Sequence, residues 1–110
     1  MAVTLIRSTP DGDLYAIEHA AGTSTVDVSP AVSGKTVSIR SGTLIVSGAA
    51  TIQLLEETSG TVLSGKFELP AASSWSIESD RNYSAATAGK KIQISRSASV
   101  AISGEIMVSS

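Results

Sequence analysis

Hydrophobic side chains recur at every second position along much of this chain. The clearest run lies near the C-terminal end, at Val100, Ile102, Gly104, Ile106 and Val108. The positions between them hold Ala101, Ser103, Glu105 and Met107. Because a β-strand directs successive side chains to opposite faces, this period of two predicts a half-buried antiparallel strand.

The same alternation appears in shorter segments elsewhere. Its apolar pairs are Val26 and Val28, Val37 and Ile39, Ile52 and Leu54, and Ile92 and Ile94. The run 44–46 is continuously apolar, which indicates a strand covered on both faces or one flanked by a bulge near Gly42 or Gly48. Further strands are expected at 3–7, 14–19, 61–69 and 75–78. The total is about eight to nine strands, roughly ten residues apart, a spacing typical of a sandwich or barrel.

Turn-forming residues separate these segments, as an all-β fold requires. They include Pro10-Asp11-Gly12-Asp13, Ala21-Gly22, Ser33-Gly34, Ser59-Gly60 and Ala88-Gly89. Only 70–74 and 83–88 offer any helical signal, and neither carries an apolar stripe. We therefore predict a single all-β domain over 1–110, an antiparallel, jelly-roll-like β-sandwich. Its terminal strands are expected to join the sheets, where a strand at an edge offers unpaired backbone to partners.

Composition narrows the chemistry available to this fold. Aromatic residues make up only 4% of 110 residues while 42% are hydrophobic, so the core is expected to consist of Val, Ile, Leu and Ala. A net charge of −2 without a basic cluster argues against binding to nucleic acid or to a membrane surface. The absence of cysteine excludes disulfides, a thiol nucleophile and cysteine-based metal sites. With neither a signal peptide nor a long apolar segment, a protein made in a cytoplasm is expected.

Candidate catalytic residues are few. His19 is the only histidine, and we interpret it as a surface or strand-end residue rather than a general base. Serine is abundant, but no Ser lies in a G-x-S-x-G turn. The segment 11–13 (Asp-Gly-Asp) lacks the further ligands of a calcium loop, so a turn is expected there.

Three other motifs also favour a structural interpretation. Glu56 and Glu57 are consecutive, so their carboxylates are expected on opposite faces of a solvated strand end. The spacing Gly60-x4-Gly65-Lys66 resembles a phosphate-binding loop, but Phe67 replaces the required Ser or Thr. Lys90-Lys91 follows a glycine and is expected to form a basic turn. The sequence therefore predicts no enzyme: no catalytic, cofactor-binding or metal-binding residue is assigned.

The aromatic residues Trp75 and Tyr83 are the remaining candidates for contact with a partner. Exposed aromatic rings can stack on sugars, whereas large buried aromatics more commonly anchor a core or a subunit interface. We expect a core or interface role for Trp75 and keep glycan contact by Trp75 and Tyr83 as the alternative.

Several segments in fixed order resemble small structural proteins of tailed bacteriophages. They are 46–54 (VSGAATIQL), 60–65 (GTVLSG), 69–72 (LPAA), 87–94 (TAGKKIQI) and 98–104 (ASVAISG). In that family an "SGA-T-V" strand, a "G–L-G" hairpin, an "L-A" step and a "TAG-L-I" strand precede a closing "VAVSG" strand. The resemblance covers residues 36–108, about two thirds of the chain.

The resemblance implies a non-enzymatic β-sandwich on the virion exterior, such as a capsid decoration (cement) protein or part of a head fibre or tail. It also implies a homotrimer that binds the major capsid protein or another virion protein, with no cofactor. Residues 1–35 lie outside the matching region, and an N-terminal attachment arm is one hypothesis for them. The alternative is a carbohydrate-binding or adhesin module of a phage tail or cell surface. Trp75 and Tyr83 exposed together in a groove would favour that alternative, and a buried Trp75 would favour the virion protein.

Overall fold

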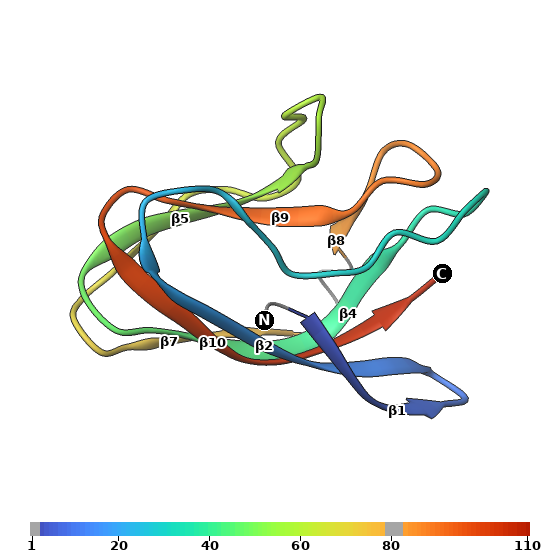
Figure 1. Ribbon diagram of the computed structural model, residues 1–110, viewed down its shortest axis with the longest axis horizontal. Helices are drawn as coiled ribbons and strands as arrows, with labels where there is room; N and C mark the ends of the chain where they lie inside the picture. Colours follow the sequence, from blue (N-terminus) through green and yellow to red (C-terminus); the bar gives the residue numbers. More distant parts are fainter. Residues whose placement is uncertain (1–2, 79–82) are drawn as a thin grey trace.

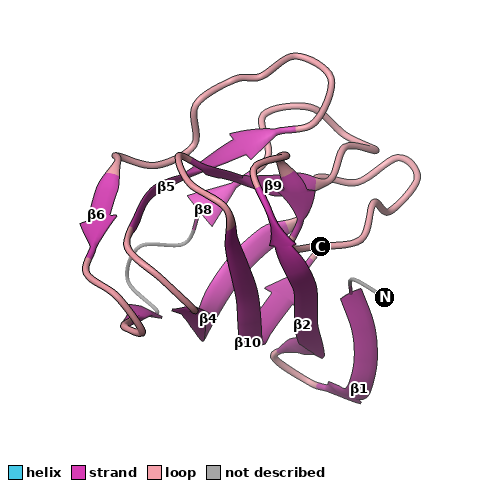
Figure 2. Cartoon of the chain, turned by 60° about the vertical axis from the view of Figure 1, so that its left-hand side comes forward, coloured by secondary structure: helices cyan, strands magenta, loops and turns pink. Residues whose placement is uncertain are grey.

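Strands account for all the regular secondary structure in the residues that the computed structural model describes, 3–78 and 83–110 (Figures 1 and 2). They are β1 (Val3–Thr9), β2 (Gly12–Gly22), β3 (Val26–Asp27), β4 (Ser38–Val46), β5 (Ala50–Glu56), β6 (Phe67–Leu69), β7 (Ser74–Ile77), β8 (Tyr83–Ser84), β9 (Ile92–Arg96) and β10 (Val100–Ser109). These ten are slightly more than the eight or nine predicted. β3 matches the alternation at Val26 and Val28, whereas the two-residue strand β8 lies in segment 83–88, where the sequence offered only a helical signal. No helix in the described residues could cross a membrane.

The strands form two antiparallel sheets, which lie as two layers in Figure 1. The larger sheet has the order β1-β2-β10-β4-β7, and β8 also pairs with β4. The smaller sheet has the order β3-β9-β5-β6. The radius of gyration is 12.7 Å, close to the ~13 Å expected of a domain of about 100 residues. The all-β, antiparallel architecture predicted from the sequence is confirmed.

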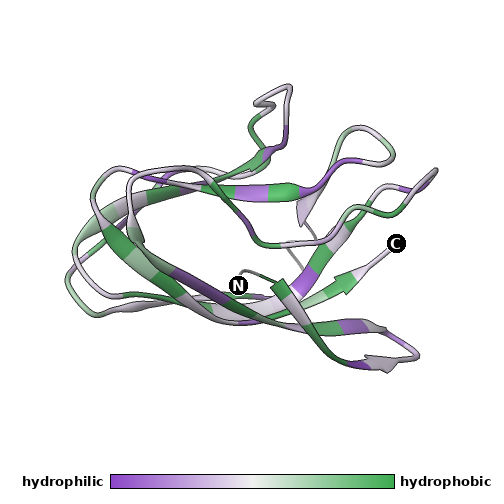
Figure 3. Cartoon of the chain, in the orientation of Figure 1, coloured by the Kyte–Doolittle hydropathy of each residue, from purple (hydrophilic) through white to green (hydrophobic). Residues whose placement is uncertain are grey.

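A single core fills the space between the sheets, and the alternation seen in the sequence builds it. Along β5 and β9 the even-numbered residues are buried and the odd-numbered ones are partly exposed. Strand β10 follows the same rule, with Ile102 and Ile106 fully buried. Apart from Trp75 the core residues are aliphatic, as composition predicted, and Figure 3 shows these apolar positions on the strands of both layers. Burying each large aliphatic side chain contributes about 1.5–3 kcal/mol.

Strand β4 joins two segments that the sequence suggested separately. Ile39 and Leu44 are both buried although they are an odd number of positions apart, which a regular strand forbids. The register explains this: Val108 pairs with Ile39 but Met107 pairs with Ser41, so one extra residue lies between them. A bulge therefore returns the buried face to the core, and the prediction of a bulge near Gly42 is confirmed.

Two glycines allow β4 and β10 to approach closely. Gly42 and Gly104 have φ angles of 152° and 133°. A Cβ atom at Gly104 would collide with the carbonyl oxygen of Thr43, and one at Gly42 would collide with that of Glu105. These contacts involve backbone atoms, which cannot rotate away, so both positions require glycine.

The two ends of the chain join the same sheet in different ways. β1 is an edge strand, as expected, and pairs with β2 alone. β10 also joins the sheet, as expected, but it lies between β2 and β4 and is not an edge strand. The predicted strand 61–69 is also shorter than expected: only Phe67–Leu69 is a strand, while Val62 forms an isolated bridge to Leu55.

Candidate functional site

An aromatic cluster closes one side of the molecule, where edge strand β7 of the larger sheet meets edge strand β6 of the smaller sheet. Phe67 comes from β6 and Trp75 from β7, so they belong to different sheets. Their ring centroids lie 4.5 Å apart at an interplanar angle of 31°. The Tyr83 ring, from β8, lies 6.0 Å from that of Trp75 at 55°. Tilted pairs at these distances are favourable beyond the area they bury.

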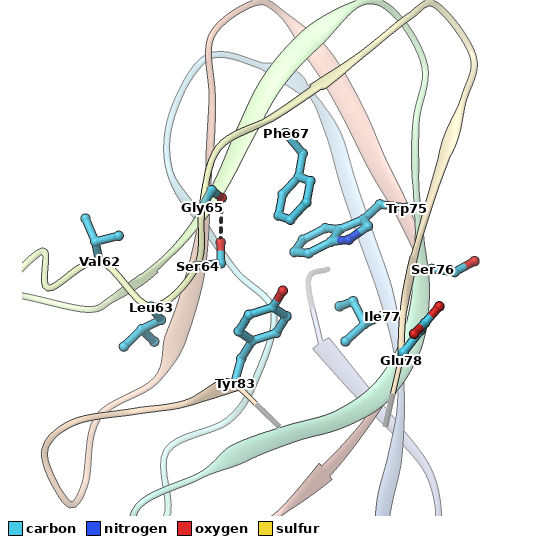
Figure 4. Close-up of a pocket in the computed structure, with 10 residues that line it drawn as sticks. All are labelled: Val62, Leu63, Ser64, Gly65, Phe67, Trp75, Ser76, Ile77, Glu78 and Tyr83. Carbon is cyan, nitrogen blue, oxygen red and sulfur yellow. Dashed lines mark hydrogen bonds between the residues drawn. The ribbon is translucent and has the colours of Figure 1, made fainter. Parts of the chain in front are cut away.

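A hollow of about 770 Å³ opens beside this cluster (Figure 4). One wall is formed by the three aromatic rings and Ile77, and Val62 and Leu63 face them across the opening. Glu78 and Ser76 lie at the β7 side, and the Ser64 hydroxyl is already bonded to the carbonyl oxygen of Gly65 (2.9 Å). The volume falls within the range of small-molecule sites, about 300–1,000 Å³.

The exposure of the aromatic side chains limits what this hollow can bind. Trp75 is buried, with 9% of its surface exposed, and both neighbouring aromatic rings pack against it. Tyr83 is half-buried. Sugar stacking requires a free ring face, and Trp75 presents little of one. The sequence-based candidates Trp75 and Tyr83 therefore line the same hollow, but they are not exposed together.

Glu56, expected at a solvated strand end, is instead buried, with 2% of its surface exposed. It follows Ile52 and Leu54 on the inner face of β5. Its carboxylate accepts hydrogen bonds from Ser59 Oγ (2.8 Å) and from the backbone N–H of Thr87 (2.6 Å). The Ser59 hydrogen bond is the largest influence on the Glu56 pKa, and with the bonds from backbone N–H groups it outweighs burial and lowers that pKa. The carboxylate joins two loops at one end of the molecule.

Arg96 joins loops in the same way at the opposite end of the smaller sheet, and it was not among the residues predicted from the sequence. Its side chain is 7% exposed and lies on the core-facing side of β9. The guanidinium donates to the carbonyl oxygens of Ser24 (2.9 Å), Ala20 (3.0 Å) and Val100 (2.6 Å). The available signal was positional: Arg96 extends the buried series Ile92 and Ile94.

His19 connects the two sheets rather than serving as an isolated surface residue. The side chain is half-buried, and its Nε2 lies 2.6 Å from the Asp27 carbonyl oxygen. A carbonyl only accepts, so Nε2 carries the proton and donates.

Asp27 itself binds two side chains of the neighbouring segment. Its carboxylate accepts from Lys91 Nζ (3.0 Å) and from Gln93 Nε2 (2.8 Å). Burial alone would raise the pKa of Asp27, but these two partners outweigh it and lower that pKa. The cluster holds β3 against β9.

The remaining motifs lie in turns and loops. Asp11 lies in the β1–β2 turn while Gly12 and Asp13 begin β2, and Thr9 Oγ1 donates to the Gly12 carbonyl oxygen (2.8 Å). Gly65 and Lys66 are exposed and are followed by strand β6, not by a helix. No group of three or more His, Cys, Asp or Glu residues able to hold a metal ion occurs in 3–78 or 83–110.

Comparison with known proteins identifies no relative of this chain. No family model matches it, and neither a curated protein nor a solved structure matches it. The site is therefore interpreted from its own geometry.

Proposed function

We propose that this chain is a non-enzymatic structural protein of a bacteriophage virion, which assembles into oligomers on the capsid surface and stabilises the shell. The two antiparallel sheets then form a jelly-roll-like β-sandwich, and the functional surfaces are those that contact other protein chains. A homotrimer on the virion exterior, bound to the major capsid protein or another virion protein, is the arrangement that the family resemblance implies.

The observation that carries this proposal is the burial of Trp75. Its ring joins Phe67 and Tyr83 in closing the gap between the two sheets. In 3–78 and 83–110 the large apolar residues left exposed are Leu5, Ile6, Ile45 and Val62, all aliphatic. Exposed aliphatic side chains are suited to contact with protein surfaces and lack the flat rings that sugars require.

The segments that carry the resemblance also support the proposal by their position. They include residues 50–54 of β5, 92–94 of β9 and 100–104 of β10, and these strands lie side by side or face one another around the core. The partly exposed positions of β10 in this region are the small residues Ala101 and Ser103, and small side chains permit close contact between chains.

The proposed mechanism is stabilisation by mass action. A protein that binds only the assembled shell lowers the free energy of that state and not of its dissociated subunits. Purified shells should therefore take up the protein in co-sedimentation and lose integrity at a higher temperature when it is bound. Shells that neither bind the protein nor change their thermal stability would contradict the proposal.

Carbohydrate binding remains the second candidate because Trp75 and Tyr83 line the same hollow beside Glu78. A glycan array separates the two functions. Specific glycan binding that is lost on Tyr83→Ala, together with no uptake by shells, would establish the adhesin function instead.

A further inference from the structure

Strand β1 has an exposed apolar surface. It forms one edge of the larger sheet, and among the described strands it pairs only with β2, which leaves the backbone groups on its other side without a partner strand in that part of the chain. In Figure 1 it extends away from the strands of the second layer. Leu5 and Ile6 are 52% and 47% exposed. An edge strand with these properties favours pairing or packing with another chain.

A hollow of about 330 Å³ lies on the outer face of the same sheet, across β2, β10 and β4. Leu14, Ile45 and Met107 provide its apolar walls. Gly42 and Gly104 also line it, and because they carry no side chains they leave the sheet surface depressed. Its size suits aliphatic side chains, since a cavity of ~150 Å³ already holds a benzene molecule.

The charges of these two surfaces are opposite. Arg7 lies on β1, which has no acidic residue. Glu105 lines the hollow. Glu18 lies on the same face of the sheet, in β2, where it is the cross-strand neighbour of Ser103. None of the three forms an ion pair with another described residue. Leu5 pairs with Tyr15, which packs on the core, and Arg7 pairs with Leu14 of the outer face, so the two side chains leave β1 on opposite faces. The edge of β1 therefore offers an apolar side chain on one face and a cation on the other to a hollow that has apolar walls and a carboxylate.

We propose that β1 of one copy binds in the outer-face hollow of a second copy, with Arg7 opposite Glu105. This inference rests on the assembly role proposed above and names the surfaces that perform it. The contact joins two different surfaces, so successive copies associate head to tail and close into a ring where the rotation permits. Pairing of β1 with β1 across a two-fold axis is less favourable, because full overlap puts Arg7 opposite Leu5 and the strand has no acidic residue to pair with Arg7.

Two single variants and their mixture test the head-to-tail contact. Leu5→Asp damages the strand and Ile45→Asp damages the hollow, so each is expected to be monomeric by light scattering. Their equimolar mixture is expected to form a dimer, since the Ile45→Asp copy still offers an intact strand and the Leu5→Asp copy an intact hollow. Val62→Asp, at an exposed loop position outside both surfaces, should keep the mass of the wild-type protein. An Ile45→Asp protein that still assembles would overturn the proposal in favour of β1–β1 pairing.

Charge exchange gives a second test that does not depend on introducing a charge at an apolar position. Arg7→Glu and Glu105→Arg should each weaken self-association by about two- to fivefold, as for an exposed ion pair. The double variant Arg7→Glu/Glu105→Arg should recover the wild-type dissociation constant, because the opposed charges are merely interchanged. A double variant as weak as the product of the two single effects would contradict the proposed pairing.

Shell binding, measured in parallel, distinguishes failure of this inference from failure of the proposed function. Wild-type protein that stays monomeric but binds shells overturns the self-association and leaves the virion function standing. Wild-type protein that associates through these surfaces but ignores shells supports the inference and contradicts the capsid assignment.

Discussion

The two edges of the larger sheet have opposite relationships with the second sheet. At the β7 edge, Trp75 points inward and meets Phe67 of β6, so apolar side chains there are covered. At the β1 edge, Leu5 and Ile6 are about half exposed, and β1 lies beyond the second layer. The smaller sheet has four strands against six in the larger one, and its coverage ends before β1.

This difference shows that an apolar residue on a strand does not always stabilise its own fold. Burial of Trp75 between the sheets contributes to the free energy of folding. Leu5 stays about half exposed and contributes little to it. The covered edge is thus suited to stability and the uncovered edge to association. A substitution at the covered edge should therefore change stability and not association, and one at the uncovered edge should change association and not stability.

Removal of the ring at the covered edge should have the largest effect. Trp75→Ala is expected to lower the free energy of unfolding by about 3–5 kcal/mol, because it leaves a cavity between β6 and β7. Urea denaturation followed by far-UV circular dichroism measures this change. Trp75→Phe keeps an aromatic ring against Phe67 and should lose clearly less. Equal stability of Trp75→Ala and the wild type would show that the aromatic cluster does not close the core.

The covered core was largely predictable from the sequence because its pattern is local. Alternation of apolar residues identified the buried faces of β5, β9 and β10. The bulge in β4 obscured the pattern, since it places Ile39 and Leu44 on one face despite their odd spacing. Glu56 and Arg96 were misjudged or overlooked because charge argued for solvent exposure, although both occupy inward positions of an alternating series.

The relationship between the two sheets could not be read from local pattern. Leu5 and Ile6 resemble core residues in the sequence, and only the pairing order shows that no strand of the smaller sheet covers them. The aromatic cluster likewise depends on β6, β7 and β8 meeting in space. Residue type suggested Trp75 and Tyr83 as contact residues, but their burial depends on long-range packing.

Substitution of Glu56 should lower stability by an intermediate amount, because its carboxylate anchors loop 57–61. The residues that follow this loop line the aromatic hollow. Glu56→Gln removes the charge and leaves one acceptor oxygen in place of two, so the amide can accept from Ser59 or from Thr87 but not from both. We expect the melting temperature at pH 7 to fall by several degrees.

The effect of Glu56→Gln should depend on pH with a definite sign. The folded-state pKa of Glu56 is lowered, so its stabilisation is present above the ordinary glutamate pKa of about 4.3 and is lost as pH falls through the folded-state value. The difference in melting temperature between variant and wild type should therefore shrink as pH falls below about 4. Glu68→Gln, at an exposed position of β6, is the matched control and should show little change. A difference that grows on acidification would contradict this account.

The smallest effect on folding is expected at the uncovered edge, with Leu5→Thr. Threonine retains the β-propensity of the strand, and Leu5 is 52% exposed, so the unfolding free energy of dilute protein should change by less than about 0.5 kcal/mol. At high protein concentration the two proteins should differ. Self-association stabilises the folded state by mass action, so the melting temperature of the wild type should rise with concentration while that of Leu5→Thr stays nearly constant. Calorimetry over a hundredfold range of concentration measures both properties in one series. A parallel rise in the two proteins would exclude Leu5 from the contact, and a large loss at every concentration would mean that Leu5 packs on its own core. The pattern expected here, unchanged folding with lost concentration dependence, would separate the associating edge from the stabilising one.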